Sequence, residues 1–168
     1  MKYALFFVFT MLAAVAFAGD SESHDQCPYH KEHSMTQMNE RGDHVMGFSQ
    51  DKATHHFTLL ANGGRISIEA NDAGDQETIG QIRMHLSHVA ESFGSGDFEM
   101  PHEIHQQTPP GVSIMQAQKD AIHYSFEKLD KGGAVKIESQ DADALSAIHD
   151  FLRFQIEEHK TGDPLEIR

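Results

Sequence analysis

Histidine is the residue type with the clearest chemical potential in this sequence. All 13 histidines lie after residue 18, and so do six of the eight methionines. Imidazole is the commonest protein ligand for transition metals, and thioether sulfur favours Cu(I). Zinc sites are built from cysteine, histidine and carboxylate side chains and rarely recruit methionine. The composition therefore predicts a bound transition-metal ion as cofactor, with copper ahead of zinc.

Two of the histidines share one face of a predicted helix. His85 and His88 lie at positions i and i+3, off the apolar stripe, so both rings project from the same polar face. Such a pair supplies only two ligands, and a solvated helix face is the alternative interpretation. The candidate ligands in the folded domain are His85 and His88, His55 or His56, His102 and His105 in a proline-containing loop, and His44 as an outer ligand.

The stretch from residue 19 to residue 50 offers a second and looser ligand set. It is polar and follows neither a strand nor a helix period, so we expect a flexible leader rich in histidine and methionine. Thiolate, imidazole and thioether together suit copper. An incidental composition is the alternative. The ligands of this second site would be Cys27, His30, His33, Met35 and Met38.

The segment 1–18 has the pattern of a secretory signal peptide. Lys2 precedes an apolar run that ends in a small-x-small cleavage sequence at Ala18. The run is too short for a stable membrane span, and no later stretch is apolar enough to be one. We therefore expect an exported protein, periplasmic or extracellular. Its mature part would divide into the leader (19–50) and a single domain (51–168).

Net charge and cysteine content limit the classes of partner that we expect. The formal net charge is −13 at pH 7, whereas nucleic acids and anionic membrane surfaces bind clusters of Lys and Arg. Cys27 is the only cysteine, so no internal disulfide can form. A metal ion is the expected partner, and another exported protein is a further candidate.

The segment 54–97 has a counterpart in the segment 123–163, and this repeat predicts the fold. Each copy has two strand-like runs that meet at a Gly-Gly pair, followed by an amphipathic helix that stops at Gly-Asp. The Gly-Gly pairs start at Gly63 and Gly132, and the Gly-Asp stops start at Gly96 and Gly162. We expect a duplicated ββα unit: an α+β fold with four antiparallel strands and two main helices packed on the sheet.

Local signals predict the strand register and the helix starts. Asn62-Gly63 is a preferred pair for a two-residue type I′ turn, which would place Leu59 opposite Ile66. The two main helices should begin after Asp75 and Asp141, since aspartate is a good N-cap residue.

The two predicted helices have diverged at the positions of the histidine pair. When the helices are aligned on their Gly-Asp stops, Phe151 aligns with His85 and Phe154 aligns with His88. Aromatic side chains in one copy thus correspond to imidazoles in the other. This asymmetry favours a specific role for the histidine-bearing face of the first helix.

Three segments carry a resemblance to a known group of proteins: GDHVMGF (42–48), HHF (55–57) and IHDFLRFQI (148–156). They resemble a family of small exported bacterial proteins, and the likeness spans roughly 41–163. Some members are labelled aspartate carbamoyltransferase. That label is not supported here, because the chain lacks the Ser-Thr-Arg-Thr phosphate motif and has one cysteine where that enzyme's regulatory chain uses four for zinc. The resemblance implies a domain outline and no mechanism.

Catalytic motifs are missing from the sequence. It contains no Gly-x-Ser-x-Gly, no phosphate-binding glycine loop and no His-Glu-x-x-His, so no catalytic residue is predicted. The favoured hypothesis is an exported protein that binds, stores or delivers a transition metal. One alternative is a small metal-dependent oxidoreductase or hydrolase with an open coordination position. The other is a metal-free interaction protein whose histidines respond to pH.

Overall fold

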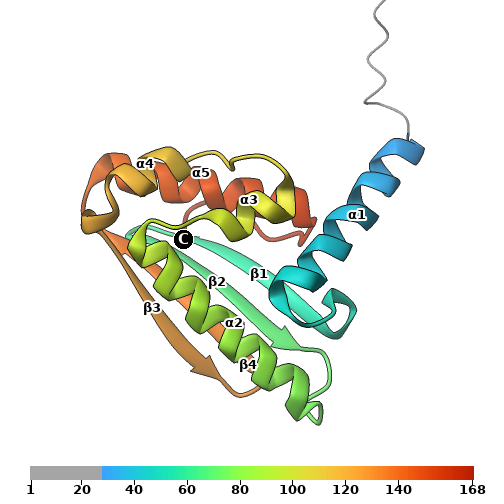
Figure 1. The fold of residues 1–168 in the computed structure, drawn as a ribbon. Helices are drawn as coiled ribbons and strands as arrows, with labels where there is room; N and C mark the ends of the chain where they lie inside the picture. The colour runs from blue at the N-terminus through green and yellow to red at the C-terminus, as the bar shows by residue number, and fades with distance from the viewer. Residues whose placement is uncertain (1–27) are drawn as a thin grey trace, which may run out of the picture.

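A four-stranded antiparallel sheet in the order β1-β2-β4-β3 forms the centre of the computed structural model, which describes residues 28–168, with side chains from residue 35 onward (Figure 1). The expected signal peptide lies outside the described residues. The strands are β1 (Ala53–Leu60), β2 (Gly63–Ala70), β3 (Ile122–Leu129) and β4 (Gly132–Ser139). The helices are α1 (Pro28–Met46), α2 (Gln76–Ser95), α3 (Glu99–His105), α4 (Val112–Ala117) and α5 (Ala142–His159), with single 3-10 turns at η2 (Gln50–Lys52) and η3 (Lys119–Ala121).

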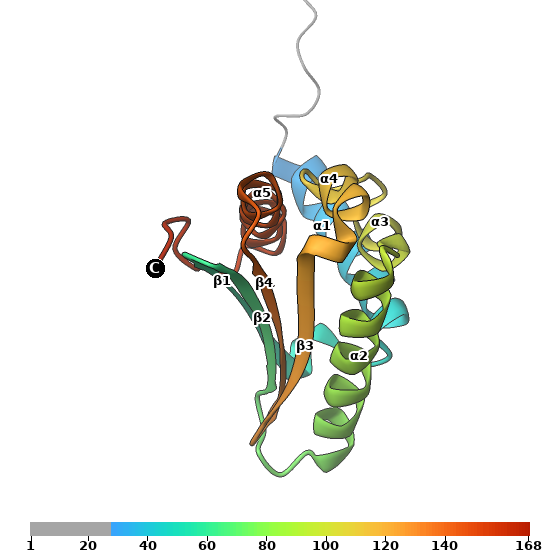
Figure 2. The same cartoon turned by 90° about the vertical axis from the view of Figure 1, so that its left-hand side faces the viewer.

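Each hairpin is covered by the helix of the other repeat. The first ββα unit is β1, β2 and α2, and the second is β3, β4 and α5, which confirms the expected duplicated α+β fold. Helix α2 packs mainly on β3 and β4, whereas α5 packs mainly on β1 and β2. Both helices lie on the same side of the sheet (Figure 2). Because the helices cross over in this way, neither repeat can bury its apolar surface alone.

Both main helices begin where the sequence predicts. The Asp75 carboxylate accepts a hydrogen bond from the Thr78 N–H at 3.0 Å, and the Asp141 carboxylate accepts one from the Ala144 N–H at 2.9 Å. Side-chain caps of this kind satisfy backbone donors that the first turn of a helix leaves unpaired. The helices start at positions 76 and 142. These two starts are separated by the same number of residues as the two Gly-Asp stops, so the alignment of the helices holds along their whole length.

The register of the first hairpin is shifted from the expected one by two positions. Leu59 pairs with Gly64 and Phe57 pairs with Ile66, so the turn consists of residues 61 and 62. Neither turn residue has a positive φ, which excludes the predicted type I′ turn. The shift is even, so the core-facing side chains are those that the sequence indicates.

Close approach of β2 to β4 explains why the glycine pairs lie in strands and not in turns. A Cβ atom at Gly63, where φ is +146°, would lie 1.9 Å from the carbonyl oxygen of Ile137. A Cβ atom at Gly132 would lie 2.0 Å from the carbonyl oxygen of Ile68. Each glycine therefore admits the backbone of the other repeat, and the pair indicates contact between strands of the two units.

Helix α1 corrects the expectation of an irregular leader over residues 28–46. Met38, Gly42 and Met46 recur at every fourth position and are buried. Because the middle residue is a glycine, the sequence does not show these positions as an apolar helical stripe. The helix packs against α3, where the Arg41 guanidinium donates from Nε to the carbonyl oxygen of Ile104 at 2.9 Å. Tertiary contacts of this kind stabilise a helix that has little amphipathic character in sequence.

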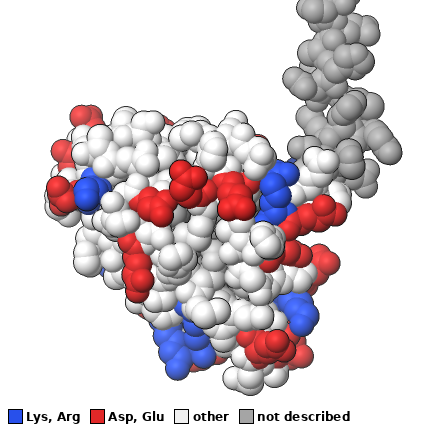
Figure 3. Space-filling view, in the orientation of Figure 1, with Lys and Arg blue, Asp and Glu red and all other residues white. Residues whose placement is uncertain are grey.

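Charge is scattered over the described surface. Figure 3 shows Asp and Glu side chains spread over the face that Figure 1 also presents, with Lys and Arg in a few separate groups. Arg65, for example, pairs with Glu127 across the face of the sheet that carries no helix. Among the described helices, none is long and apolar enough to cross a membrane, in agreement with the sequence.

Substitution of the strand glycines tests the contact between the repeats. We expect Gly63→Ala or Gly132→Ala to lower the free energy of unfolding by about 3 kcal/mol or more, because the new methyl group overlaps a carbonyl oxygen of the facing strand. Urea denaturation followed by circular dichroism measures the change.

Gly80 provides the matched control for this experiment. It lies within α2, and nothing approaches within 4 Å of its would-be Cβ atom. Gly80→Ala should raise the free energy of unfolding by about 0.5–1 kcal/mol through helix propensity. Equal effects at Gly63 and Gly80 would contradict the close approach of the two strands.

Candidate functional site

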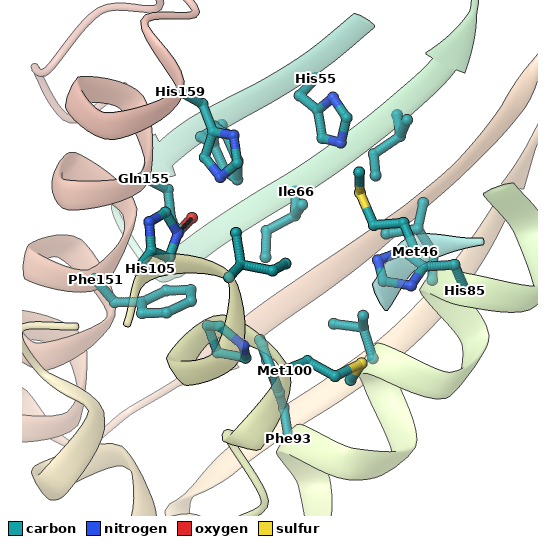
Figure 4. Close-up of a pocket in the computed structure, with 16 residues that line it drawn as sticks. Met46, His55, Ile66, His85, Phe93, Met100, His105, Phe151, Gln155 and His159 are labelled. Carbon is teal, nitrogen blue, oxygen red and sulfur yellow. Dashed lines mark hydrogen bonds between the residues drawn. The ribbon is translucent and has the colours of Figure 1, made fainter. Parts of the chain in front are cut away.

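One cavity of about 70 Å³ lies between the sheet and the helices α2, α3 and α5. Its wall is mostly apolar, and four imidazoles line it, those of His55, His85, His105 and His159 (Figure 4). We call it the histidine cavity. Its other lining residues are Met46, Phe57, Ile66, Ile68, Leu86, Val89, Phe93, Met100, Pro101, Ile104, Phe151 and Gln155.

The four histidines come from four different elements. His55 has the same strand parity as Phe57 on β1 and so faces the core. His85 lies in the middle of α2, while His105 and His159 are the last residues of α3 and α5. Side chains from opposite ends of the domain sequence therefore meet at one place, which only the crossing of the helices over the sheet makes possible.

The imidazoles belong to a continuous row of rings. The ring centre of His105 lies 5.1 Å from that of His159, which lies 5.8 Å from that of His55. Phe48 continues the row, with its centre 6.4 Å from His55 and 5.9 Å from His85. His55, His159 and His105 thus form one group, and Phe48 separates His85 from it.

The apolar surroundings of three of these half-buried imidazoles hold them in the neutral form at pH 7. Burial of the ring lowers the pKa of His55 and of His85 to about 4, with smaller contributions from neighbouring histidines. Burial also lowers the pKa of His159 to about 3, assisted by the proximity of His55 and His105. A charged imidazolium would lose its hydration in this apolar wall without gaining an anionic partner of matching strength.

His105 has more polar neighbours than the other three histidines. Burial lowers its pKa, although the hydrogen bond with Gln155 and the nearby Glu158 carboxylate act in the opposite direction. Its Nε2 atom lies 3.1 Å from the Gln155 Oε1 atom. Its Nδ1 atom is buried without a hydrogen-bond partner, and so is the Nε2 atom of His55. Two ring nitrogens thus make no hydrogen bond, although that of His105 lies 3.9 Å from the Glu158 carboxylate.

Two thioethers complete the set of soft donors. Met46 from the end of α1 and Met100 from α3 both line the histidine cavity. In Figure 4 Met46 lies towards the His85 end of the cavity. Met46 is 6% exposed, so its sulfur is largely shielded from water. A cavity that combines imidazole and thioether donors matches the preferences of Cu(I).

The cavity breaks the symmetry of the duplicated fold. His159 occupies the position in α5 that Phe93 occupies in α2, and His55 occupies the position in β1 that Tyr124 occupies in β3. In one half of the molecule Phe93 packs edge-on against Tyr124 at 5.9 Å. In the other half His55 and His159 meet at 5.8 Å. A pair of imidazoles thus stands in one half where the other half has a pair of aromatic rings.

The structure places the sequence-predicted ligands in several locations. His55, His85 and His105 meet in the histidine cavity. His88 is exposed on the outer side of α2, and His56 points to the opposite side of β1, where its Nδ1 atom lies 3.0 Å from the Asp163 carboxylate.

His102 and His44 also lie outside the cavity. Both are exposed. His102 lines a separate hollow beside Phe98 and Gln116, since it precedes His105 on a short helix that turns only one of the two rings inward. The pair of loop histidines that the sequence groups together is therefore divided between the cavity and the surface.

The expected second site over the leader is only partly described. Cys27 and the side chains of His30 and His33 lie outside the described residues. Met38 is 4% exposed and belongs to the buried stripe of α1, so it is not part of a loose ligand set. Met35 is half-buried on the same helix.

Sequence reasoning missed His159, Met46 and Met100 as members of the site. The signal for His159 was available, because alignment of the two main helices places it opposite the buried Phe93. The two methionines carry no such signal, since methionine on a helix is most often a core residue.

The site is not a preformed three-ligand cage. Among the described residues, no three His, Cys, Asp or Glu side chains stand in positions that would hold one metal ion. Comparison of the chain with family models, with curated proteins and with solved structures found no match. The resemblance to small exported bacterial proteins therefore stays a prediction.

The buried neutral imidazoles predict a stability that falls in mild acid. An unfolded histidine has a pKa near 6.5, so between about pH 7 and pH 4 the unfolded chain binds more protons than the folded one. The contribution of these groups to stability is present above pH 7 and is lost as the pH falls through 6.5 towards the folded pKa values of about 4 for His55 and His85 and about 3 for His159. We expect a loss of about 1 kcal/mol or more for each of His55, His85 and His159 between pH 7 and pH 5.

Urea denaturation of the metal-free protein at several pH values measures this dependence. His55→Tyr with His159→Phe copies the aromatic pair of the other half and should flatten the profile. His102→Gln removes an exposed histidine and should leave the slope as it is. A stability that stays constant between pH 7 and pH 5 would mean that these imidazoles are not held neutral by burial.

Proposed function

We propose that this protein binds one copper ion as Cu(I) in the histidine cavity, and that it stores or delivers copper outside the cytoplasm. The observation that carries the proposal is the convergence of four imidazoles and two thioethers from five elements on one small apolar cavity. Zinc is the second candidate ion, because imidazole also suits zinc.

The spacing of the rings supports a shared ion. Two imidazoles that bind one metal at about 2.0 Å from each nitrogen have ring centres roughly 5–6 Å apart. The centres of His105 and His159 lie 5.1 Å apart, and those of His159 and His55 lie 5.8 Å apart. The rings of His55 and His159 are stacked with an interplanar angle of 8°, so coordination of one ion requires them to rotate about their side-chain bonds.

The unpaired nitrogens support the same conclusion. His55 Nε2 and His105 Nδ1 are buried without a hydrogen-bond partner, and an unsatisfied buried polar atom has a free-energy cost of about 1–3 kcal/mol. Coordination of a metal removes that cost at both atoms. Water bound in the cavity would do so only by forming weaker contacts to a mostly apolar wall.

The neutral state of the imidazoles favours metal binding further. A metal must displace a proton from a protonated imidazole before it can bind. Since the pKa of His55 and His85 is about 4, protons do not compete at pH 7. The thioethers of Met46 and Met100 then favour Cu(I) over Zn²⁺, because soft sulfur donors prefer the softer ion.

Copper titration of the full mature chain tests the proposal. In the presence of a coloured Cu(I) chelator and a reductant, we expect the histidine cavity to withdraw one copper ion per chain, beyond any ion held by the leader ligands Cys27, His30 and His33, and to withdraw zinc from an equivalent chelator less strongly. His55→Tyr with His159→Phe should weaken copper binding by about 100-fold or more, because it removes two ligands and retains a packing already used in the other half.

The control is His102→Gln, which should bind copper like the parent chain. Circular dichroism confirms that each variant is folded before titration. Full copper binding by the folded double variant would overturn the assignment of the site. Failure of the parent chain to bind copper or zinc would overturn the proposed function.

A metal-free, pH-responsive role is the second candidate function. The lowered pKa values of His55, His85 and His159 favour it, since protonation of these groups would loosen the packing around the cavity. A melting temperature that rises on addition of Cu(I) at pH 7 supports the copper role. One that responds to pH and not to copper supports the second candidate.

A further inference from the structure

A groove of about 660 Å³ on the surface lies beside the histidine cavity. It runs between the end of α1 and the outer side of α2. Its wall includes Met84, His88 and Glu91 from α2 and Val45 from α1. We call it the outer groove.

The outer groove and the histidine cavity share a wall. Met46 and His85 line both of them. The two side chains come from different helices, and each is a candidate copper ligand. On its inner side His85 is in ring contact with Phe48, which in turn packs on His55. The wall between the outer groove and the histidine cavity thus contains two possible copper ligands, the Met46 thioether and the His85 imidazole, in addition to apolar groups.

The surface side of this wall carries two more donors of the same kinds. Met84 is 70% exposed, which is unusual for a large apolar side chain. His88 is exposed as well and lies one helical turn after Met84, so the thioether and the imidazole are neighbours on one face of α2. Glu91 follows a further turn along the same face.

We infer that the outer groove is the entrance for copper: Met84 and His88 take up Cu(I) at the surface, and Met46 with His85 pass it through the shared cavity, past the Phe48 ring, to His55 and His159. This inference rests on the proposed function. It adds a surface uptake site and a direction of transfer that the cavity alone does not supply.

The transfer is an exchange of ligands at one ion. Cu(I) keeps its oxidation state throughout, because each step replaces one thioether or imidazole ligand by another and no electron is transferred. Ions with thioether and imidazole ligands exchange them through intermediates that hold both old and new donors. The pairing of one sulfur with one nitrogen at the surface and again in the wall suits such a sequence.

The rate of copper loading tests the inference. A Cu(I) complex of a coloured chelator is mixed with the metal-free protein in a stopped-flow instrument, and the loss of colour reports uptake. For Met84→Leu with His88→Gln we expect loading about ten-fold slower or more, because the ion is no longer held next to the wall. The copper bound at equilibrium should match that of the parent chain, and His102→Gln should load at the parental rate.

Each other outcome has a distinct meaning. Loading of the double variant at the parental rate would overturn the entrance while leaving the copper site in place. Loss of bound copper at equilibrium in the folded double variant would also overturn it, because Met84 and His88 would then be ligands of the resident ion. If the parent chain takes up no copper at all, the proposed function fails, and the inference falls with it.

Discussion

The pairing of β2 with β4 is the constraint on which the rest of the structure depends. It joins the two ββα repeats into one sheet, and it requires glycine where each strand meets a carbonyl oxygen of the other repeat. Within this sheet, the helix of each repeat packs mainly on the hairpin of the other. The space between α2 and α5 is therefore enclosed by both repeats, and the histidine cavity lies in that space.

Duplication allows the two halves of this space to differ. The positions that hold Phe93 and Tyr124 in one half hold His159 and His55 in the other. The aromatic half contributes ring contacts of Phe93 with Tyr124 and Phe151, although the Tyr124 hydroxyl is buried without a hydrogen-bond partner. The imidazole half is then free to lose some packing energy and to leave ring nitrogens unpaired. A single-copy domain of similar size would have to place the same polar groups in its only core.

The fold could be predicted from the sequence because its signals are local and occur twice. Two aspartate caps and two apolar helix stripes specify the helices, and two alternating runs in each copy specify the strands. The turn prediction was wrong because the Gly-Gly pair allows close contact between strands of the two repeats. That contact cannot be recognised from the sequence of one hairpin. Helix α1 was missed for a related reason, since Gly42 stands within its buried stripe and packing on α3 supplies the stability.

The candidate site was predictable only in part, because spacing within one helix does not decide which neighbours point inward. His85 and His88 look equivalent in sequence, yet one reaches the cavity and the other the surface, and the same holds for His105 and His102. The larger question is why a domain would bury imidazoles whose nitrogens lack partners. Without a ligand such groups destabilise the fold, and increasingly so in acid. An ion that binds only the folded state reverses this, because its binding free energy adds to the stability of the folded chain. The same nitrogens that weaken the metal-free domain, on His55 of β1 and His105 of α3, would then link those two elements, in addition to the hydrogen bond that joins His105 to Gln155 of α5.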